Sequence, residues 1–150
     1  VPINYGNQPS IQTAFIFKQL DRPDLTQYWS RKVIGKVFNG LSPATGYNGD
    51  EDQGLMGSLA VLMKIGLFQM NGGTENDPIY ELGSPIFDKI EIGLHPDYYT
   101  GEKFTILANN NGMDQWTIKN ASINGKALIG YSVRHSQLVK GAELELEMGE

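Results

Sequence analysis

The sequence predicts an α+β fold in which helices come first and a small antiparallel β-sheet, or half of a β-sandwich, follows. Apolar residues recur at three- and four-residue steps up to about residue 72, and from about residue 79 they alternate with polar residues. Turn-forming glycine, asparagine and proline residues cluster between these two patterns, at residues 71–78. We therefore expect a helical part, residues 1–72, and a β-rich part, residues 73–150.

Three helices are predicted in the first part, each with an apolar stripe. Ser10 is the expected N-cap of the first helix, Asp24 of the second and Asp52 of the third, because short polar side chains accept hydrogen bonds from a first helical turn. Gly66 is expected to end the third helix, residues 53–65. Three helices bury too little apolar surface to be stable alone, so we expect further helices in a longer parent protein.

Strands are predicted where apolar and polar residues alternate, in stretches bounded by turn-forming residues. The stretches are residues 79–82, 89–94, 104–108, 121–128 and 144–148. Asn124 and Gly125 divide the fourth stretch, and this pair is typical of a two-residue type I′ hairpin turn. Short, evenly spaced strands of this kind favour a small antiparallel sheet.

Composition excludes several classes of protein. The chain has 17 acidic and 12 basic residues with no basic cluster, so a nucleic-acid partner is not expected. There is no cysteine, which excludes disulfides, thiolate metal sites and a cysteine nucleophile. No apolar run approaches the ~20 residues of a membrane span. The first residues are Val-Pro-Ile with no initiating methionine, so we expect a piece of a longer protein whose secretion signal, if any, lies outside it.

The first candidate site is an acidic turn directly before the third helix. Asp50, Glu51 and Asp52 follow one another, and Gly49 and Gly54 flank them. Free N–H groups at a helix N-terminus stabilise negative charge, and an ionised carboxylate suits a general base or a cation ligand. The alternative is that these residues are ordinary caps and solvated charge.

The second candidate site is a polar turn near the start of the chain. Asn7 and Gln8 precede Pro9 and Ser10, where backbone N–H groups and side-chain amides are suited to bind sugar hydroxyls. An ordinary capped helix start is the alternative. His95 and His135 lack metal-ligand spacing, and surface histidines are expected at both positions.

Three blocks carry a family resemblance, and their order and spacing support it. They are Gly6-Asn7-Gln8-Pro9-Ser10; Gly49-Asp50-Glu51-Asp52-Gln53-Gly54, followed by Met56 and Ser58; and Gly83-Ser84-Pro85-Ile86-Phe87-Asp88-Lys89. With residues 64–70, the hairpin at residues 118–126 and the final stretch, residues 140–149, they resemble the carboxy-terminal part of a glycoside hydrolase family 92 enzyme, an exo-acting α-mannosidase. The resemblance covers nearly the whole chain.

The resemblance implies a calcium-dependent, inverting enzyme whose catalytic (α/α)6 barrel is joined to a β-sandwich. The helices here would then be the last of that barrel. Asp50 and Asp52 match the two aspartates of the family's acidic turn, and Asp52 is the first choice for the general base. Asn7 and Gln8 match a turn that touches the terminal sugar or its calcium, so the implied calcium ligands are Asn7 and Asp50.

The chain departs from the family at three positions: glutamate often stands where Gln8 is found, and histidines where Ile11 and Gln12 are found. The family's general acid lies upstream of this chain.

The function implied by the resemblance is the removal of terminal α-linked mannose from glycans, with this piece supplying the general base and being inactive alone. The expected partners are a mannose-containing glycan and the rest of the parent enzyme, with self-association through exposed helix faces. A periplasmic or extracellular, bacterial-type location is implied. The alternative function is a non-catalytic carbohydrate-binding or structural module, which the β-rich second half favours.

Overall fold

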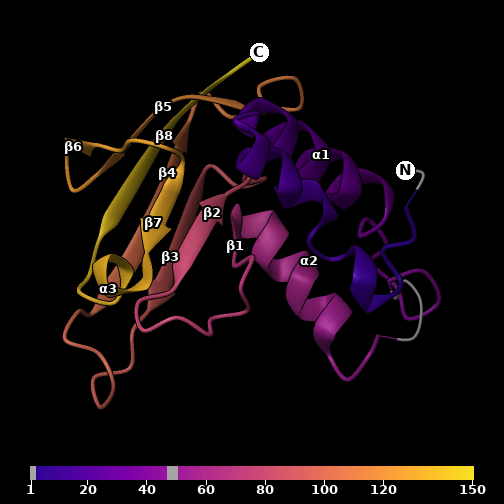
Figure 1. Cartoon of the computed structure of the whole chain (residues 1–150), viewed down its shortest axis with the longest axis horizontal. Helices are drawn as coiled ribbons and strands as arrows, with labels where there is room; N and C mark the ends of the chain where they lie inside the picture. Colours follow the sequence, from indigo (N-terminus) through magenta and orange to yellow (C-terminus); the bar gives the residue numbers. More distant parts are fainter. Residues whose placement is uncertain (1–2, 47–50) are drawn as a thin grey trace.

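The N-terminal helices occupy one side of the molecule, and the strands, with a short helix near the C-terminus, occupy the other (Figure 1), which confirms the predicted α+β class. The computed structural model describes residues 3–46 and 51–150. Asp50 therefore lies outside the described residues. No helix in the described part of the chain is long and apolar enough to cross a membrane.

The helical layer contains two short 3₁₀-helices and two α-helices. They are η1 (Gln8–Ser10), η2 (Thr13–Leu20), α1 (Pro23–Lys36) and α2 (Leu55–Ile65). The prediction of one helix capped by Ser10 is wrong, because the chain forms η1 and η2 there instead. Asp24 does not cap α1 either. Pro23 begins α1 with its fixed φ, so Asp24 falls in the first turn, where Arg22 donates to its carboxylate at 2.7 and 2.9 Å.

Helix α2 begins two residues later than predicted, with Gly54 at the N-cap position. The expectation that Asp52 caps this helix is wrong, since its side chain makes no cap hydrogen bond. The predicted C-terminal end is confirmed. Gly66 has a φ of 81°, and its N–H group donates to the carbonyls of Leu62 and Met63.

The strands form two sheets. The smaller is antiparallel, with the order β1 (Leu67–Phe68), β2 (Ile79–Leu82), β7 (Ser132–Arg134). The larger has the order β3 (Lys89–Gly93), β4 (Lys103–Asn109), β8 (Glu143–Gly149), β5 (Thr117–Ile123), β6 (Lys126–Ala127). A short helix, α3 (His135–Leu138), follows β7 directly.

One strand pair differs from the predicted antiparallel sheet. Strands β4 and β8 are parallel, with Ile106 opposite Leu144. The 33 residues between them contain β5, β6, β7 and α3, which return the chain to the end from which β4 started. The predicted hairpin is confirmed, because Asn124 (φ 49°) and Gly125 (φ 72°) form the turn between β5 and β6.

Two hydrophobic cores stabilise the fold. One lies between the two sheets and includes Leu67, Leu82, Ile106 and Leu144. The other lies within the helical layer and is formed by Tyr5, Ala14, Phe15, Val33, Ile34, Phe38, Leu59, Met63 and Phe68. Adjacent residues of β1 therefore enter different cores, since side chains alternate along a strand. Phe68 stacks on Phe15 with ring centroids 4.3 Å apart.

Arg31 joins α1 to the strands. Its guanidinium donates to the carbonyls of Ser84 (3.1 Å) and Gly112 (3.2 Å), to the carbonyl of Pro85 and to Oδ1 of Asn111. Burial lowers the pKa of Arg31. One side chain thus holds together the helical layer, the segment after β2 and the loop after β4.

Replacement of Arg31 by alanine is expected to lower the free energy of unfolding by about 2–4 kcal/mol, because it leaves several part-buried carbonyls without donors. Arg31→Lys should retain only part of the lost stability, since an ammonium group does not have the planar set of donors with which the guanidinium reaches several separate acceptors. Chemical denaturation measures the change. The control is Arg22→Ala, which removes an exposed ion pair and should change little; equal losses in the two variants would contradict the role of Arg31.

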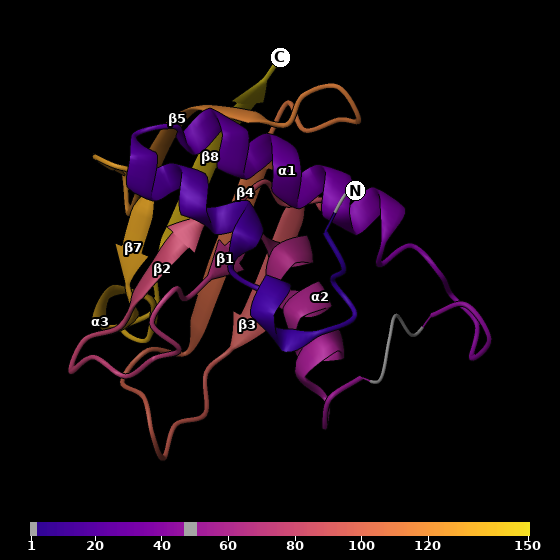
Figure 2. The same ribbon diagram turned by 45° about the vertical axis from the view of Figure 1, so that its right-hand side comes forward.

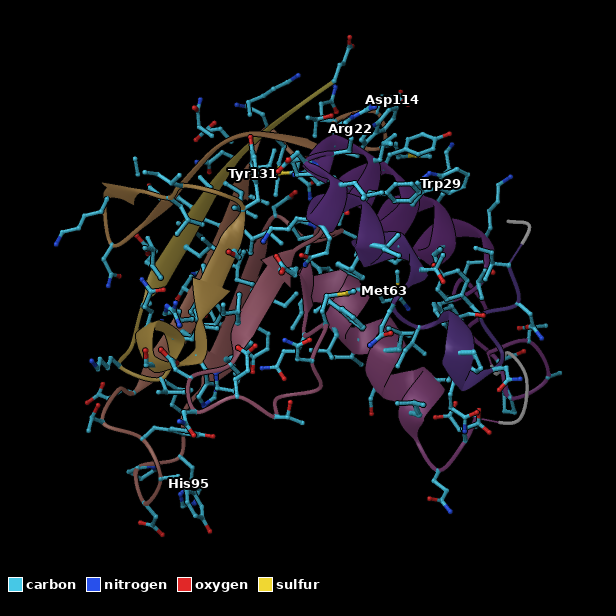
Figure 3. All side chains as sticks on the ribbon, viewed as in Figure 1. Arg22, Trp29, Met63, His95, Asp114 and Tyr131 are labelled. Carbon is cyan, nitrogen blue, oxygen red and sulfur yellow. The ribbon has the colours of Figure 1, made fainter. Side chains whose placement is uncertain are left out.

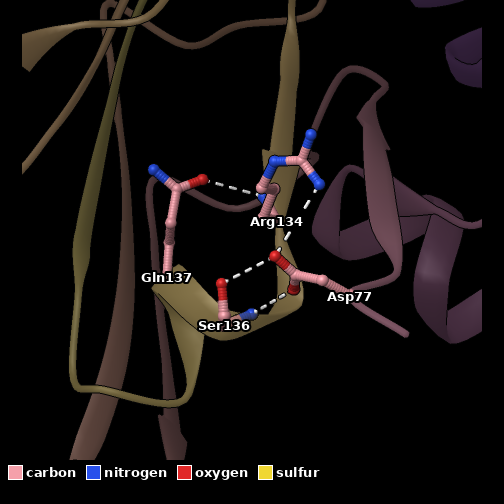
Figure 4. A network of polar contacts seen from close by, with 4 residues as sticks. All are labelled: Asp77, Arg134, Ser136 and Gln137. Atoms are coloured by element: carbon pink, nitrogen blue, oxygen red, sulfur yellow. Dashed lines mark hydrogen bonds and ion pairs between the residues drawn. The ribbon is translucent and has the colours of Figure 1, made fainter. Parts of the chain in front are cut away.

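A polar network ties the loop before β2 to α3 (Figure 4). The Asp77 carboxylate accepts hydrogen bonds from the N–H group and the hydroxyl of Ser136, both at 2.9 Å, and lies 3.7 Å from Nη1 of Arg134. These donors, with the Ser136 N–H contributing most, hold the pKa of Asp77 below its usual value. Gln137 adds a hydrogen bond from the Arg134 N–H to its side-chain oxygen at 2.9 Å.

The lowered pKa of Asp77 predicts a pH-dependent contribution to stability. A carboxyl whose pKa is lower in the folded state stabilises the fold above its unfolded pKa of about 3.9, and this stabilisation is lost as the pH falls through the folded value. Asp77→Asn should therefore lower the melting temperature at pH 7. It should also reduce the difference between the melting temperatures at pH 7 and pH 3. The exposed Asp114 supplies the control: Asp114→Asn should leave both melting temperatures unchanged.

Candidate active site

The two predicted turns lie at the same end of the helical layer. Asp52 lies in the turn that leads into α2, and Asn7 and Gln8 lie at the start of η1. In both views η1 lies beside the N-terminal half of α2 (Figures 1 and 2). His95, by contrast, is exposed in the loop between β3 and β4, far from the helical layer (Figure 3).

The acidic turn has an unusual backbone. Four consecutive residues are in the left-handed region: Glu51 (φ 61°), Asp52 (49°), Gln53 (60°) and Gly54 (89°). For a residue with a side chain this conformation costs roughly 1–2 kcal/mol, and it normally occurs at single positions. Backbone hydrogen bonds hold the turn against α2, from the Leu55 N–H to the Asp52 carbonyl (3.3 Å) and from the Met56 N–H to the Glu51 carbonyl (3.2 Å).

The carboxylates of this turn have different environments. Oε1 of Glu51 accepts a hydrogen bond from the N–H group of Gly57 in the first turn of α2, at 2.9 Å. The half-buried Asp52 makes no side-chain hydrogen bond and no ion pair with any residue in the described part of the chain. Glu51 therefore performs the capping role predicted for Asp52. This role of Glu51 was not predicted from the sequence, because capping preference favours the shorter aspartate side chain.

The buried side chain of Tyr5 anchors the polar turn at Asn7. Tyr5 is buried in the helical core, and burial raises the pKa of its hydroxyl. Asn7 and Gln8 are both exposed, and the Asn7 side chain does not cap η1. The alternative of a capped helix start, for which Ser10 was the expected cap, is thus not formed, because Asn7 stands at the N-cap position of η1 without a cap hydrogen bond.

The described part of the chain has a hollow beside the acidic turn and a larger one on other elements. The hollow beside the acidic turn measures about 220 Å³ and is lined in part by Phe38, Glu51, Met56 and Gly57. A larger hollow of about 430 Å³ lies elsewhere, beside η2 and β2, where the buried Glu81 pairs with Lys18 at 2.7 Å.

The oxygen donors of the two turns have the chemistry that calcium prefers, namely carboxylate and amide oxygens. Within residues 3–46 and 51–150, however, no group of three or more histidine, aspartate or glutamate side chains could hold a metal ion.

This fold occurs within glycoside hydrolases. The structure resembles the family GH92 α-mannosidase BT3965 from Bacteroides thetaiotaomicron, solved with mannoimidazole, with a TM-score of 0.85 and 23% identity over 97% of this chain. It also resembles the family GH92 inverting mannosidase BT2199 from the same species, with a TM-score of 0.81 and 33% identity over 96% of this chain.

The chain belongs to glycosyl hydrolase family 92, because residues 2–150 match the family described as "Glycosyl hydrolase family 92 catalytic domain". The resemblance predicted from the sequence blocks is thereby confirmed. A curated relative, an uncharacterized secreted glycosidase from Arthroderma benhamiae, is 31% identical over 146 residues, or 96% of this chain. The chain spans 18% of that relative and 18% of each of the two mannosidases.

The environment of Asp52 predicts how a substitution affects stability. Because its carboxylate has no partner among the described residues, Asp52→Asn should change the free energy of unfolding by less than about 0.5 kcal/mol. Gly54→Ala is the matched comparison, since it places a side chain at a φ of 89° and should cost about 1 kcal/mol or more. A large loss in Asp52→Asn, measured by chemical unfolding, would show that Asp52 has a structural role.

Proposed function

We propose that the parent protein is an exo-α-mannosidase that removes terminal α-linked mannose from glycans by calcium-assisted inverting hydrolysis, and that this chain supplies the general base. The observation that carries the proposal is the Asp52 carboxylate, which has no described partner and lies in a left-handed turn at the start of α2. Family membership supports it, as do the printed activities of the similar structures, a mannosidase and an inverting mannosidase.

Inverting hydrolysis needs an acid and a base on opposite faces of the sugar, about 6.5–9.5 Å apart, with a water molecule beside the base. A general base must be ionised and available to accept a proton from that water. In this proposal Asp52 accepts the proton, and Asp50, which lies outside the described residues, is the second candidate. The general acid comes from the rest of the parent.

The exposed amides of Asn7 and Gln8 are proposed to bind the terminal sugar, since amide groups both donate to and accept from hydroxyls. Asn7 and Asp50 are proposed as calcium ligands, with the remaining ligands supplied by the rest of the parent. Bound calcium would hold two sugar hydroxyls and favour distortion of the ring.

The helices are proposed to be the end of an (α/α)6 barrel, with residues 1–72 in the barrel and residues 73–150 in a β-rich part. Several apolar side chains of this layer are exposed, including Ile16, Leu20 and Val61, and the rest of the parent is their proposed partner, with self-association in its absence. The parent is proposed to act in the periplasm or outside the cell, since a relative is described as secreted.

A second candidate function is a non-catalytic carbohydrate-binding or structural module. The observation that favours it is the larger polar hollow beside Glu81, which lies on different elements from the acidic turn. The two functions differ in whether an aspartate of the acidic turn, Asp52 or Asp50, is required for turnover.

In the full-length parent, Asp52→Asn should lower kcat for an α-mannoside by about 10²–10⁴-fold, because it removes the proton acceptor for water while the fold is kept. Steady-state kinetics measure the loss, and circular dichroism confirms the fold. The isolated chain, assayed alongside, should show no turnover. Wild-type kcat in the variant would remove Asp52 from the base role and leave Asp50; wild-type kcat in Asp50→Asn as well would favour the non-catalytic module.

A further inference from the structure

The Glu51 carboxylate has a contact that the proposed chemistry does not use. Its Oε1 atom lies 2.9 Å from the N–H group of Gly57, and the Glu51 carbonyl accepts from the Met56 N–H at 3.2 Å. One residue therefore holds the first turn of α2 through both its main chain and its side chain. Gly54, at the N-cap position, has no side chain that could do this.

The turn before α2 has a strained backbone that needs a stabilising contact such as this hydrogen bond. Glu51, Asp52 and Gln53 all have positive φ values, between 49° and 61°, which L-residues rarely adopt in succession. Strain of this kind persists where surrounding contacts over-determine the backbone. The hydrogen bond from the Gly57 N–H group to Oε1 of Glu51 is such a contact.

The residue at position 57 fits this arrangement. A Cβ atom added to Gly57 would lie 2.9 Å from Oε1 of Glu51, closer than a real Cβ approaches another atom. Any larger residue would displace the carboxylate, although alanine is the better helix former. Glycine at this helix position therefore gives the Glu51 carboxylate its access to the N–H group.

We propose that Glu51 is a positioning residue for Asp52: its hydrogen bond to the Gly57 N–H keeps the left-handed turn in place and so fixes the direction in which the Asp52 side chain leaves the backbone. The inference rests on the proposed function of Asp52. Glu51 and Asp52 are consecutive, so rotation of the Glu51 backbone out of the left-handed region would redirect the Asp52 Cα–Cβ bond.

The test uses the full-length parent and four variants beside Asp52→Asn. Glu51→Ala and Gly57→Ala should each lower kcat for an α-mannoside by about 10- to 100-fold with KM nearly unchanged, because small misplacements of a catalytic group cost rate. Glu51→Gln should keep kcat within about threefold of wild type, since its amide oxygen still accepts a hydrogen bond.

Gly35→Ala is the matched control for Gly57→Ala. Gly35 lies inside α1, and an added Cβ there would meet nothing within 4 Å. Gly35→Ala gains helix propensity and loses no contact, while in Gly57→Ala a similar gain, about 1 kcal/mol, offsets the lost hydrogen bond, so neither variant should lower the melting temperature. Reduced kcat with an unchanged KM in Gly57→Ala, with wild-type kcat in Gly35→Ala and no loss of thermal stability in either, would support positioning, because general unfolding would lower the melting temperature together with kcat.

The experiment distinguishes failure of the positioning role of Glu51 from failure of the proposed role of Asp52. Wild-type kcat in Glu51→Ala and Gly57→Ala, together with an inactive Asp52→Asn, would overturn the positioning role and leave the proposed function standing. An active Asp52→Asn would overturn the base role of Asp52 and, with it, the inference. A Glu51→Gln variant as impaired as Glu51→Ala would also overturn the positioning role, because it would show that the negative charge of Glu51 itself is required.

Discussion

The structure depends on the different burial of two adjacent side chains. Leu67 enters the core between the sheets, while Phe68 enters the helical core and stacks on Phe15. The αL conformation of Gly66 places this strand directly after α2. Each layer therefore depends on the other, because one short strand contributes to both cores and neither core can be completed without it.

Local features account for what was predictable from the sequence. Alternation of apolar residues placed the strands, and Asn124 with Gly125 placed a hairpin, since both signals depend on neighbouring residues alone. The parallel pairing of β4 with β8 was not predictable in this way, because it depends on the route of the chain between them. The short elements β7 and α3 had no periodic signal long enough to detect.

The acidic turn was found from the sequence, but the roles within it were not. Capping preference favours aspartate, and it led to Asp52 as the cap. The left-handed backbone changes which side chain faces the helix, so the longer side chain of Glu51 reaches the Gly57 N–H and the Asp52 carboxylate makes no hydrogen bond with a described residue. Backbone handedness at successive residues was not apparent from their types. Asp50 lies outside the described residues, so its predicted roles stay predictions.

Strand β8 has a position in the larger sheet that affects how the chain can assemble. It contains residues 143–149, and it lies between β4 and β5 in the middle of the five strands. Before these residues leave the ribosome, the strands of the larger sheet that are already synthesised can form only two separate ribbons, β3 with β4 and β5 with β6. The edges of β4 and β5 that later bind β8 would stay open in the nascent chain, where they offer a surface for chaperones or for unwanted pairing between chains.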